Sequence, residues 1–110
     1  MSTIEVRQYQ TQDGKVPVLE WLSGFRDRIT RARINARLDR LVLGLRGDWR
    51  SVGGGVNELR IDHGPGYRVY FAQHANTVVI LLCGGDKRTQ AKDIEQAHAY
   101  WKDYKARNRT

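Results

Sequence analysis

The hydrophobic pattern of this 110-residue chain predicts an α+β fold, a small antiparallel sheet with helices packed on it. Two observations carry this prediction. Three short runs between residues 56 and 83 are apolar or alternate with period two, and turn signals separate them. Apolar residues at helical spacing come before these runs and after them. A chain this short supports one hydrophobic core, so residues 1–110 are expected to form a single domain.

The N-terminal half contains one predicted strand and two predicted helices. Residues 3–9 (TIEVRQY) alternate apolar with polar side chains, as a half-buried strand does. Pro17 suits the start of a short helix that reaches Phe25. From Thr30, the expected cap, apolar residues at i, i+4, i+7, i+8 and i+11 predict a second helix that ends near residues 44–47. The short connection predicts an antiparallel helical hairpin against the sheet.

The C-terminal half is expected to form an antiparallel meander and a final helix. Residues 56–62 and 67–73 alternate, so one side of each strand should pack and the other should be polar. Residues 78–83 are apolar on both faces, the pattern of a central covered strand. Residues 94–105 then follow helical spacing, and residues 51–55 are expected to be a flexible stretch. The predicted order is β-α-α-β-β-β-α, with the C-terminal helix also on the sheet.

The charge balance favours a polyanionic partner. Nineteen Lys and Arg against twelve Asp and Glu give a net charge of +7, and fourteen of the cations are Arg. Guanidinium groups bind phosphates bidentately, which an ammonium group does not. A solvated surface explains the same composition. The longest apolar run, residues 78–83, is far shorter than a membrane span, and the N-terminus lacks a signal pattern, so a cytoplasmic protein without membrane contact is expected.

Several kinds of site find no support in the sequence. The single cysteine, Cys83, lies inside an apolar run, so we expect a buried thiol and no intrachain disulfide. His63, His74 and His98 do not have the spacing of zinc ligands, so no metal and no cofactor are expected. No serine lies in a nucleophile elbow, and the glycine-rich stretches lack the nucleotide-binding patterns.

Cations and a phenol gather on the predicted sheet. Side chains alternate between the two faces of a strand, and by this parity Arg60 on one strand and Arg68 and Tyr70 on the next point to the same face of the sheet. Lys87 and Arg88 follow directly after the last strand. If the hairpin pairs Arg60 with Arg68, two like charges lie close together, which implies an anion between them. Surface salt bridges to neighbouring carboxylates explain the same residues.

A basic ridge is predicted on the second helix. Arg33, Arg37 and Arg40 fall at i, i+4 and i+7. A solvated helix face and a docking surface for RNA or for a protein partner fit this pattern equally well.

Three segments of the chain resemble the RelE/HigB-like toxins. They are VNELRI (56–61), GPGYRVYF (64–71) and LLCGGDKRTQ (81–90), followed by Asp93-Ile94. The chain is most similar to the branch of phage-derived addiction-module killer proteins, from residue 4 to about residue 101. The resemblance implies a RelE-like fold and the toxin of a type II toxin-antitoxin system.

The resemblance also implies an activity and partners. Such toxins are endoribonucleases that cleave mRNA in the ribosomal A site and so inhibit translation. They need no metal, because the 2′-hydroxyl attacks its own phosphodiester and leaves a 2′,3′-cyclic phosphate. The implied partners are mRNA, the ribosome and a cognate antitoxin, commonly a helix-turn-helix repressor, with operator DNA reached only through the antitoxin complex. The alternative is a non-catalytic basic module, a degenerate toxin that binds antitoxin or nucleic acid.

The resemblance assigns roles to individual residues. The arginine of the family's GYR motif corresponds to Arg68, and the basic residue after the last strand corresponds to Lys87 or Arg88. Arg60 lies where many members carry a further cation. Residues 87–93 contain no tyrosine, although some RelE proteins have one there, so the group that transfers the proton is open among Tyr70, His63 and Glu58. The expected catalytic set is Arg60, Arg68, Lys87, Arg88 and Tyr70, and the expected RNA- and ribosome-binding set is Arg33, Arg37, Arg40 and His63.

Overall fold

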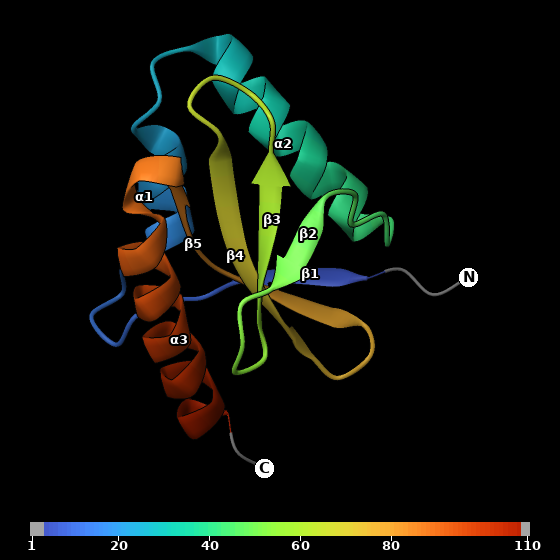
Figure 1. Ribbon diagram of the computed structural model, residues 1–110. Helices are drawn as coiled ribbons and strands as arrows, with labels where there is room; N and C mark the ends of the chain where they lie inside the picture. The colour runs from blue at the N-terminus through green and yellow to red at the C-terminus, as the bar shows by residue number, and fades with distance from the viewer. Residues whose placement is uncertain (1–3, 109–110) are drawn as a thin grey trace.

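A five-stranded mixed sheet forms the centre of the molecule, and helices cover both of its faces (Figure 1). The computed structural model describes residues 4–108. The predicted α+β class is confirmed. The elements in chain order are β1 (Glu5–Gln8), α1 (Pro17–Ser23), α2 (Arg28–Val42), β2 (Trp49–Ser51), β3 (Val56–Ile61), β4 (Tyr67–His74), β5 (Val78–Asp86), a 3-10 turn η1 (Lys87–Thr89) and α3 (Gln90–Arg107).

The strand order is β1-β5-β4-β3-β2, and the sheet is not wholly antiparallel as predicted. β1 pairs with β5 in parallel, with Glu5 opposite Val78 and Gln8 opposite Leu81. The predicted first strand began at Thr3, which lies outside the described residues. The predicted meander is confirmed, because β3, β4 and β5 pair antiparallel in sequence.

The strand β2 is an element that the sequence analysis missed. It pairs antiparallel with β3, and the connection between them contains three glycines with positive φ, up to +88° at Gly53. At Gly55, a side chain would also lie 2.9 Å from the indole nitrogen of Trp101. The stretch 51–55, expected to be flexible, therefore consists of the last residue of β2 and the turn of a hairpin. The order is β-α-α-β-β-β-β-α.

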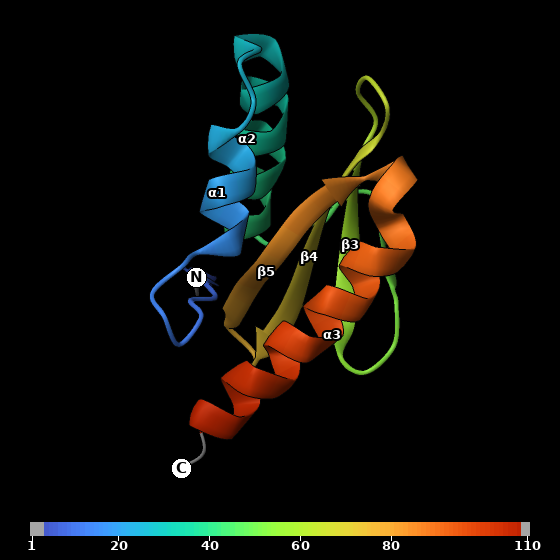
Figure 2. The ribbon, with the colours of Figure 1, turned by 90° about the vertical axis from the view of Figure 1, so that its left-hand side faces the viewer.

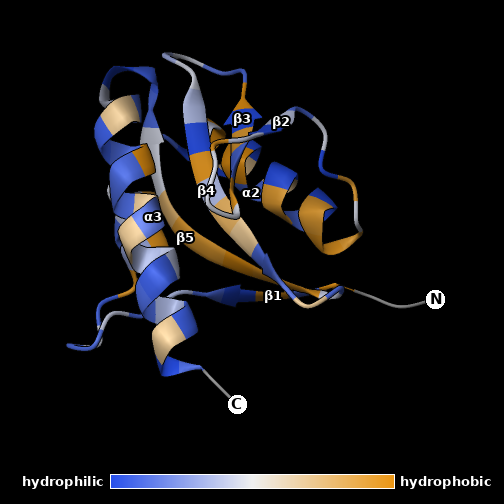
Figure 3. Cartoon of the chain, turned by 60° about the horizontal axis from the view of Figure 1, so that its bottom comes forward, coloured by the Kyte–Doolittle hydropathy of each residue, from blue (hydrophilic) through white to orange (hydrophobic). Residues whose placement is uncertain are grey.

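Both faces of the sheet are covered, α1 and α2 lying on one and α3 on the other (Figure 2). Alternate residues of β5 contribute to the two layers, which confirms its prediction as a covered strand; its apolar character is visible in Figure 3. The prediction that one side of β3 packs and the other is polar is wrong in that both sides pack. Val56 and Glu58, on the side expected to be polar, are fully buried in the layer of α3. Within residues 4–108 no helix combines the length and hydrophobicity that crossing a bilayer requires.

Both boundaries of α2 differ from the prediction. The cap of α2 is Asp27 and not Thr30: the Asp27 carboxylate accepts hydrogen bonds from the backbone N–H of Ile29 at 3.0 Å and from the Thr30 hydroxyl at 2.8 Å. The helix ends at Val42, before the predicted residues 44–47. The last apolar residue of the predicted stripe, Leu45, is therefore 58% exposed.

The paired glycines at the end of β5 let helices approach both faces of the sheet at one point. A Cβ at Gly84 would overlap the six-membered ring of Trp21 from α1, and a Cβ at Gly85 would overlap the Asp93 carboxylate from α3. Neither glycine needs a positive φ, so close packing accounts for both. This packing fixes α1 and α3 around the strand end where Lys87 and Arg88 emerge.

Candidate active site

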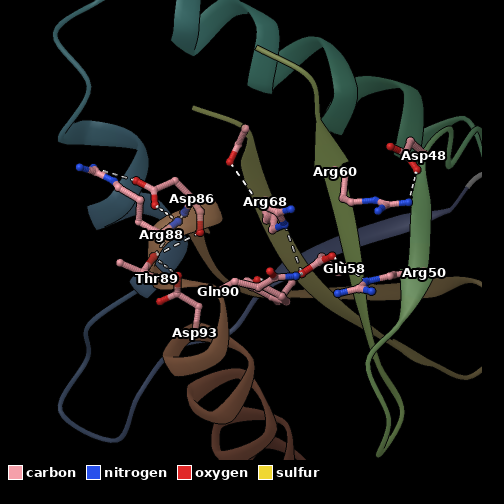
Figure 4. A network of polar contacts seen from close by, with 12 residues as sticks. Asp48, Arg50, Glu58, Arg60, Arg68, Asp86, Arg88, Thr89, Gln90 and Asp93 are labelled. Carbon is pink, nitrogen blue, oxygen red and sulfur yellow. Dashed lines mark hydrogen bonds and ion pairs between the residues drawn. The ribbon is translucent and has the colours of Figure 1, made fainter. Parts of the chain in front are cut away.

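Arg60 and Arg68 lie directly opposite one another on β3 and β4. Both point to the α3 side of the sheet (Figure 4). Strand parity predicted that they share a side, and the register shows that they also face one another. Both contribute to one open hollow of about 210 Å³, which we call the arginine hollow. Its lining consists of Asp48, Arg60, Ile61, Asp62, Gly66, Tyr67 and Arg68.

Each of the two arginines also has a carboxylate partner. Arg60 Nη2 lies 2.9 Å from Asp48 Oδ1, and Arg68 Nε lies 3.4 Å from Glu58 Oε2. The Arg60 side chain is 40% exposed, whereas that of Arg68 is 13% exposed. The Nε–H groups of both are buried and make no hydrogen bond of good geometry within residues 4–108. Buried donors of this kind carry a desolvation cost that an acceptor oxygen in the hollow would relieve.

Glu58 is the fixed anion beneath the arginine hollow. Its side chain is fully buried and accepts hydrogen bonds from Arg50 Nε at 3.0 Å, Tyr70 Oη at 3.0 Å and Gln90 Nε2 at 2.9 Å. Burial by itself raises the pKa of Glu58, but the hydrogen bonds from Gln90, Tyr70 and Arg50 outweigh it and hold the pKa below its ordinary value. Glu58 therefore remains a carboxylate and holds Arg68 through charge.

Tyr70 lies in the same buried network and not on the surface. Its ring is fully buried, and its hydroxyl donates to Glu58. Burial, followed by the nearby charge of Glu58, raises the pKa of Tyr70 far above its ordinary value. The structure thus places this predicted catalytic residue where it orients Glu58 and has no access to a substrate atom.

Lys87 and Arg88 emerge at the end of β5, as expected, but neither lines the arginine hollow. The backbone N–H of Lys87 donates to the Gly66 carbonyl at 3.0 Å, and Arg68 Nη1 approaches the same oxygen at 3.4 Å. The backbone of the exposed Lys87 therefore lies close to the Arg68 side chain. Arg88 points away from Arg68 in Figure 4; its side chain is 81% exposed and pairs with Asp86 at 3.1 Å.

The four residues of the expected RNA- and ribosome-binding set line one hollow of about 240 Å³ between α2 and the end of β3. These residues are Arg33, Arg37, Arg40 and His63. Arg33 and Arg40 are exposed, but Arg37 is half-buried and donates to the backbone carbonyls of Arg60 and Arg46. His63 Nε2 lies 3.2 Å from the Thr30 hydroxyl. The basic ridge therefore contains two exposed cations, Arg33 and Arg40, and one with a structural role.

Three polar residues of the site escaped the sequence analysis. Asp48 and Arg50 come from β2 and the loop before it, and Gln90 begins α3. The segment WRSVGGGVNEL does carry a hairpin signal, two strand-like runs around a short glycine turn, which would have placed Arg50 opposite Glu58. Gln90 has no such local signal, because only the packing of α3 brings it to the sheet.

The arrangement suits the binding of a phosphate. Two guanidinium groups face one open hollow, and a buried carboxylate network fixes one of them. Guanidinium donors in a partly desolvated site stabilise developing negative charge on a phosphoryl group. Within residues 4–108 no three His, Cys, Asp or Glu side chains come together as a metal-binding group.

Comparison with known proteins gives two matches. A family model, described as phage derived protein Gp49-like, matches residues 20–102, which include the arginine hollow and the Glu58 network. The chain is also 50% identical over 95 residues to an uncharacterized protein of Haemophilus influenzae, strain Rd. That match covers 86% of this chain and 90% of its relative.

Proposed function

The chain belongs to the phage-derived Gp49-like family, and from this premise we propose that it is the toxin of a type II toxin-antitoxin system. We propose a RelE-like fold and an endoribonuclease activity that cleaves mRNA on the ribosome. The resemblance of residues 56–94 to the RelE/HigB-like toxins supports this proposal, as does the excess of arginine. The observation that carries it is the pairing of Arg60 with Arg68 across one open hollow.

In this proposal the scissile phosphate lies between the two guanidinium groups. The RNA 2′-hydroxyl loses its proton, its oxygen bonds to phosphorus, and the bond from phosphorus to the 5′-oxygen breaks as that oxygen takes up a proton. Arg60 and Arg68 stabilise the charge of the phosphorane, and Lys87 binds a neighbouring phosphate. The products are a 2′,3′-cyclic phosphate and a 5′-hydroxyl.

The three candidates for proton transfer differ in their access to RNA. Glu58 and Tyr70 are fully buried, and each is engaged in the network beneath Arg68. His63 is half-buried and lines the hollow between α2 and the end of β3. That hollow and the arginine hollow share Ile61 and Asp62 in their linings. An imidazole both accepts and donates protons near neutral pH. We therefore assign proton transfer to His63 and a positioning role to Tyr70 and Glu58.

A cognate antitoxin, a helix-turn-helix repressor in this proposal, neutralises the toxin by covering the arginine hollow or by blocking ribosome entry. Exposed apolar side chains in the segment after α2 support a protein partner: Leu43 is 71%, Leu45 58% and Trp49 39% exposed. Arg46 stacks on Trp49, with 4.7 Å between the guanidinium carbon and the ring centroid.

The test is induced expression in bacteria, with growth and new mRNA 5′ ends as the two readouts. Arg60→Ala and Arg68→Lys should abolish both, since each removes one guanidinium fork, and lysine keeps a positive charge opposite Glu58. Lys102→Ala, an exposed cation on α3, is the matched control and should behave as the wild type. Circular dichroism of the purified variants verifies that they are folded.

The alternative function gives a different pattern. Growth arrest without new mRNA ends would support a non-catalytic binding module. Unchanged cleavage in folded Arg60→Ala and Arg68→Lys variants would remove both residues from the active site.

A further inference from the structure

A second hollow, of about 430 Å³, lies at the same end of the sheet. We call it the aromatic hollow, because the rings of Trp21, Phe25 and Tyr67 line it. The exposed Arg88 and two carboxylates complete the lining, together with Gly24 and Pro65; the carboxylates are those of Glu20 and Asp86. All three rings pack against the hydrophobic core with part of each side chain left accessible, and the proposed cleavage chemistry makes no use of this accessible aromatic surface.

The three rings form a preorganised cluster. Trp21 and Phe25 meet edge to face at 5.1 Å between centroids and 82° between planes, and Phe25 meets Tyr67 at 5.0 Å and 84°. Trp21 packs directly on Gly84, where no side chain separates the indole from β5. All three side chains are only partly buried. A ligand with a flat ring therefore finds aromatic surface that is already ordered.

The aromatic hollow adjoins the arginine hollow, because Tyr67 lines both. Tyr67 lines the two hollows, while the adjoining Gly66 lines one and Pro65 the other. A phosphate between Arg60 and Arg68 would thus lie in a hollow that shares the Tyr67 ring with the aromatic hollow. Arg88 is directed away from Arg68 and lines the rim of the aromatic hollow, where its guanidinium can contact a ligand.

We propose that the aromatic hollow is a base-stacking subsite. It takes one unstacked nucleobase of the RNA whose phosphate lies between Arg60 and Arg68, and in this it rests on the proposed function. Proteins bind single-stranded RNA by stacking splayed bases on aromatic rings and on arginine planes. Phe25 and Tyr67 supply the rings, and Arg88 supplies a guanidinium at the rim.

The experiment measures binding and not cleavage. The probe is a seven-nucleotide RNA with a 2′-deoxy residue at the scissile position, which removes the attacking hydroxyl. At low salt the net charge of +7 favours binding whether or not the protein is catalytic. One series of probes carries 2-aminopurine at successive positions, since its fluorescence falls on stacking. A second series carries an abasic residue at the same positions.

Phe25→Leu removes one ring of the hollow and keeps an apolar side chain. We expect it to weaken binding of the intact probe about 5- to 150-fold, the range for loss of one stacked base. The matched control is Tyr100→Leu, a half-buried aromatic residue that stacks on Tyr9 and lines neither hollow; it should bind as the wild type. In wild-type protein, 2-aminopurine should be quenched at one position next to the 2′-deoxy residue.

The decisive comparison combines protein and RNA changes. An abasic residue at the quenched position should weaken binding to the wild type as much as Phe25→Leu does, and should have little further effect on that variant. Additive effects, or the absence of any position with quenching, would overturn the subsite. Unchanged RNA binding by Phe25→Leu, with loss of binding to the co-encoded antitoxin, would assign the hollow to a protein partner instead. A coupled effect in a protein whose induced expression produces no new mRNA 5′ ends in bacteria would keep the subsite and reject the proposed activity.

Discussion

The guanidinium of Arg37 on α2 donates a hydrogen bond of 2.6 Å to the backbone carbonyl oxygen of Arg60 on β3. A second nitrogen of the same group donates to the carbonyl of Arg46 at 2.9 Å. Arg37 thereby ties α2 to the strand that carries Arg60 and to the loop before β2. Its neighbours on the basic ridge, Arg33 and Arg40, are exposed to solvent.

This difference predicts separate effects within one ridge. Arg37→Ala should lower the free energy of unfolding by about 2 kcal/mol, because it leaves half-buried carbonyl groups without a charged donor. Arg40→Ala, the matched control, should change it by less than about 0.5 kcal/mol, as exposed substitutions do. Urea unfolding followed by circular dichroism measures both. Equal losses in the two variants would contradict the structural role of Arg37.

Much of the fold follows from local pattern, and the exceptions other than β2 depend on contacts distant in sequence. The alternation in residues 56–73 and the apolar run in β5 were sufficient for the meander and for placing Arg60 and Arg68 on one side of it. The parallel pairing of β1 with β5 joins segments more than seventy residues apart, and no local signal specifies it. The burial of Glu58 did have a signal, because the apolar stripe of α3 requires an apolar sheet face to cover.

The candidate site was predictable only as far as the strands that carry it. Strand parity was enough to place Arg60 and Arg68 on one side. Strand parity could not identify the carboxylates that pair with these arginines. Asp48 lies in the unpredicted segment before β2, and Glu58 is a buried anion only because α3 covers it. Adjacency in sequence was also misleading for Arg88. Its position next to Lys87 suggested a shared site, but its side chain lines the aromatic hollow.

The packing of Trp21 on Gly84 predicts a large cost for a single added methyl group. A Cβ at Gly84 would overlap a rigid indole that Phe25 and Tyr67 hold in place, so Gly84→Ala should destabilise the fold by about 3 kcal/mol, near the upper end for overpacking. Gly24→Ala is the control. Gly24 has a φ of −75°, and a Cβ there would make only an ordinary contact at 3.4 Å.

Gly24→Ala should therefore be neutral or stabilise the protein by up to about 1 kcal/mol, through the lower entropy of the unfolded chain. Thermal or urea unfolding of both variants provides the measurement. If Gly84→Ala unfolds at the same denaturant concentration as the wild type, the close approach of Trp21 to β5 is not maintained in solution.

Cys83 should be chemically inert in the folded protein. Burial, and after it the charge of Asp93, raises the pKa of the Cys83 thiol to about 12, so the reactive thiolate is rare at pH 8. We expect a thiol reagent such as 5,5′-dithiobis(2-nitrobenzoate) to label it at least a hundredfold more slowly than the same chain in 6 M guanidinium chloride. Stoichiometric labelling of native protein within seconds would show that the strand end around Cys83 opens readily.

Glu58 should make the stability of the protein depend on pH in the acidic range. Its pKa in the folded state lies below the ordinary value of 4.5, because hydrogen bonds from Gln90, Tyr70 and Arg50 outweigh the effect of burial. The folded protein therefore binds this proton less readily than the unfolded chain does. The stabilisation from ionised Glu58 is fully present above about pH 5.5 and is lost as the pH falls through 4.5 toward the folded-state pKa.

Glu58→Gln removes this titration and should lower the free energy of unfolding by about 2 kcal/mol at pH 7, since Arg68 and Arg50 lose their common anion. The difference from the wild type should shrink as the pH falls from 5 to 3 in urea unfolding experiments. Glu95→Gln, an exposed change on α3, is the control and should alter stability by less than about 0.5 kcal/mol. At a temperature where Glu58→Gln remains folded, growth inhibition should still fall, because Arg68 is no longer held toward the hollow. A stability difference that stays constant down to pH 3 would show that Glu58 is not the buried carboxylate on which the position of Arg68 depends.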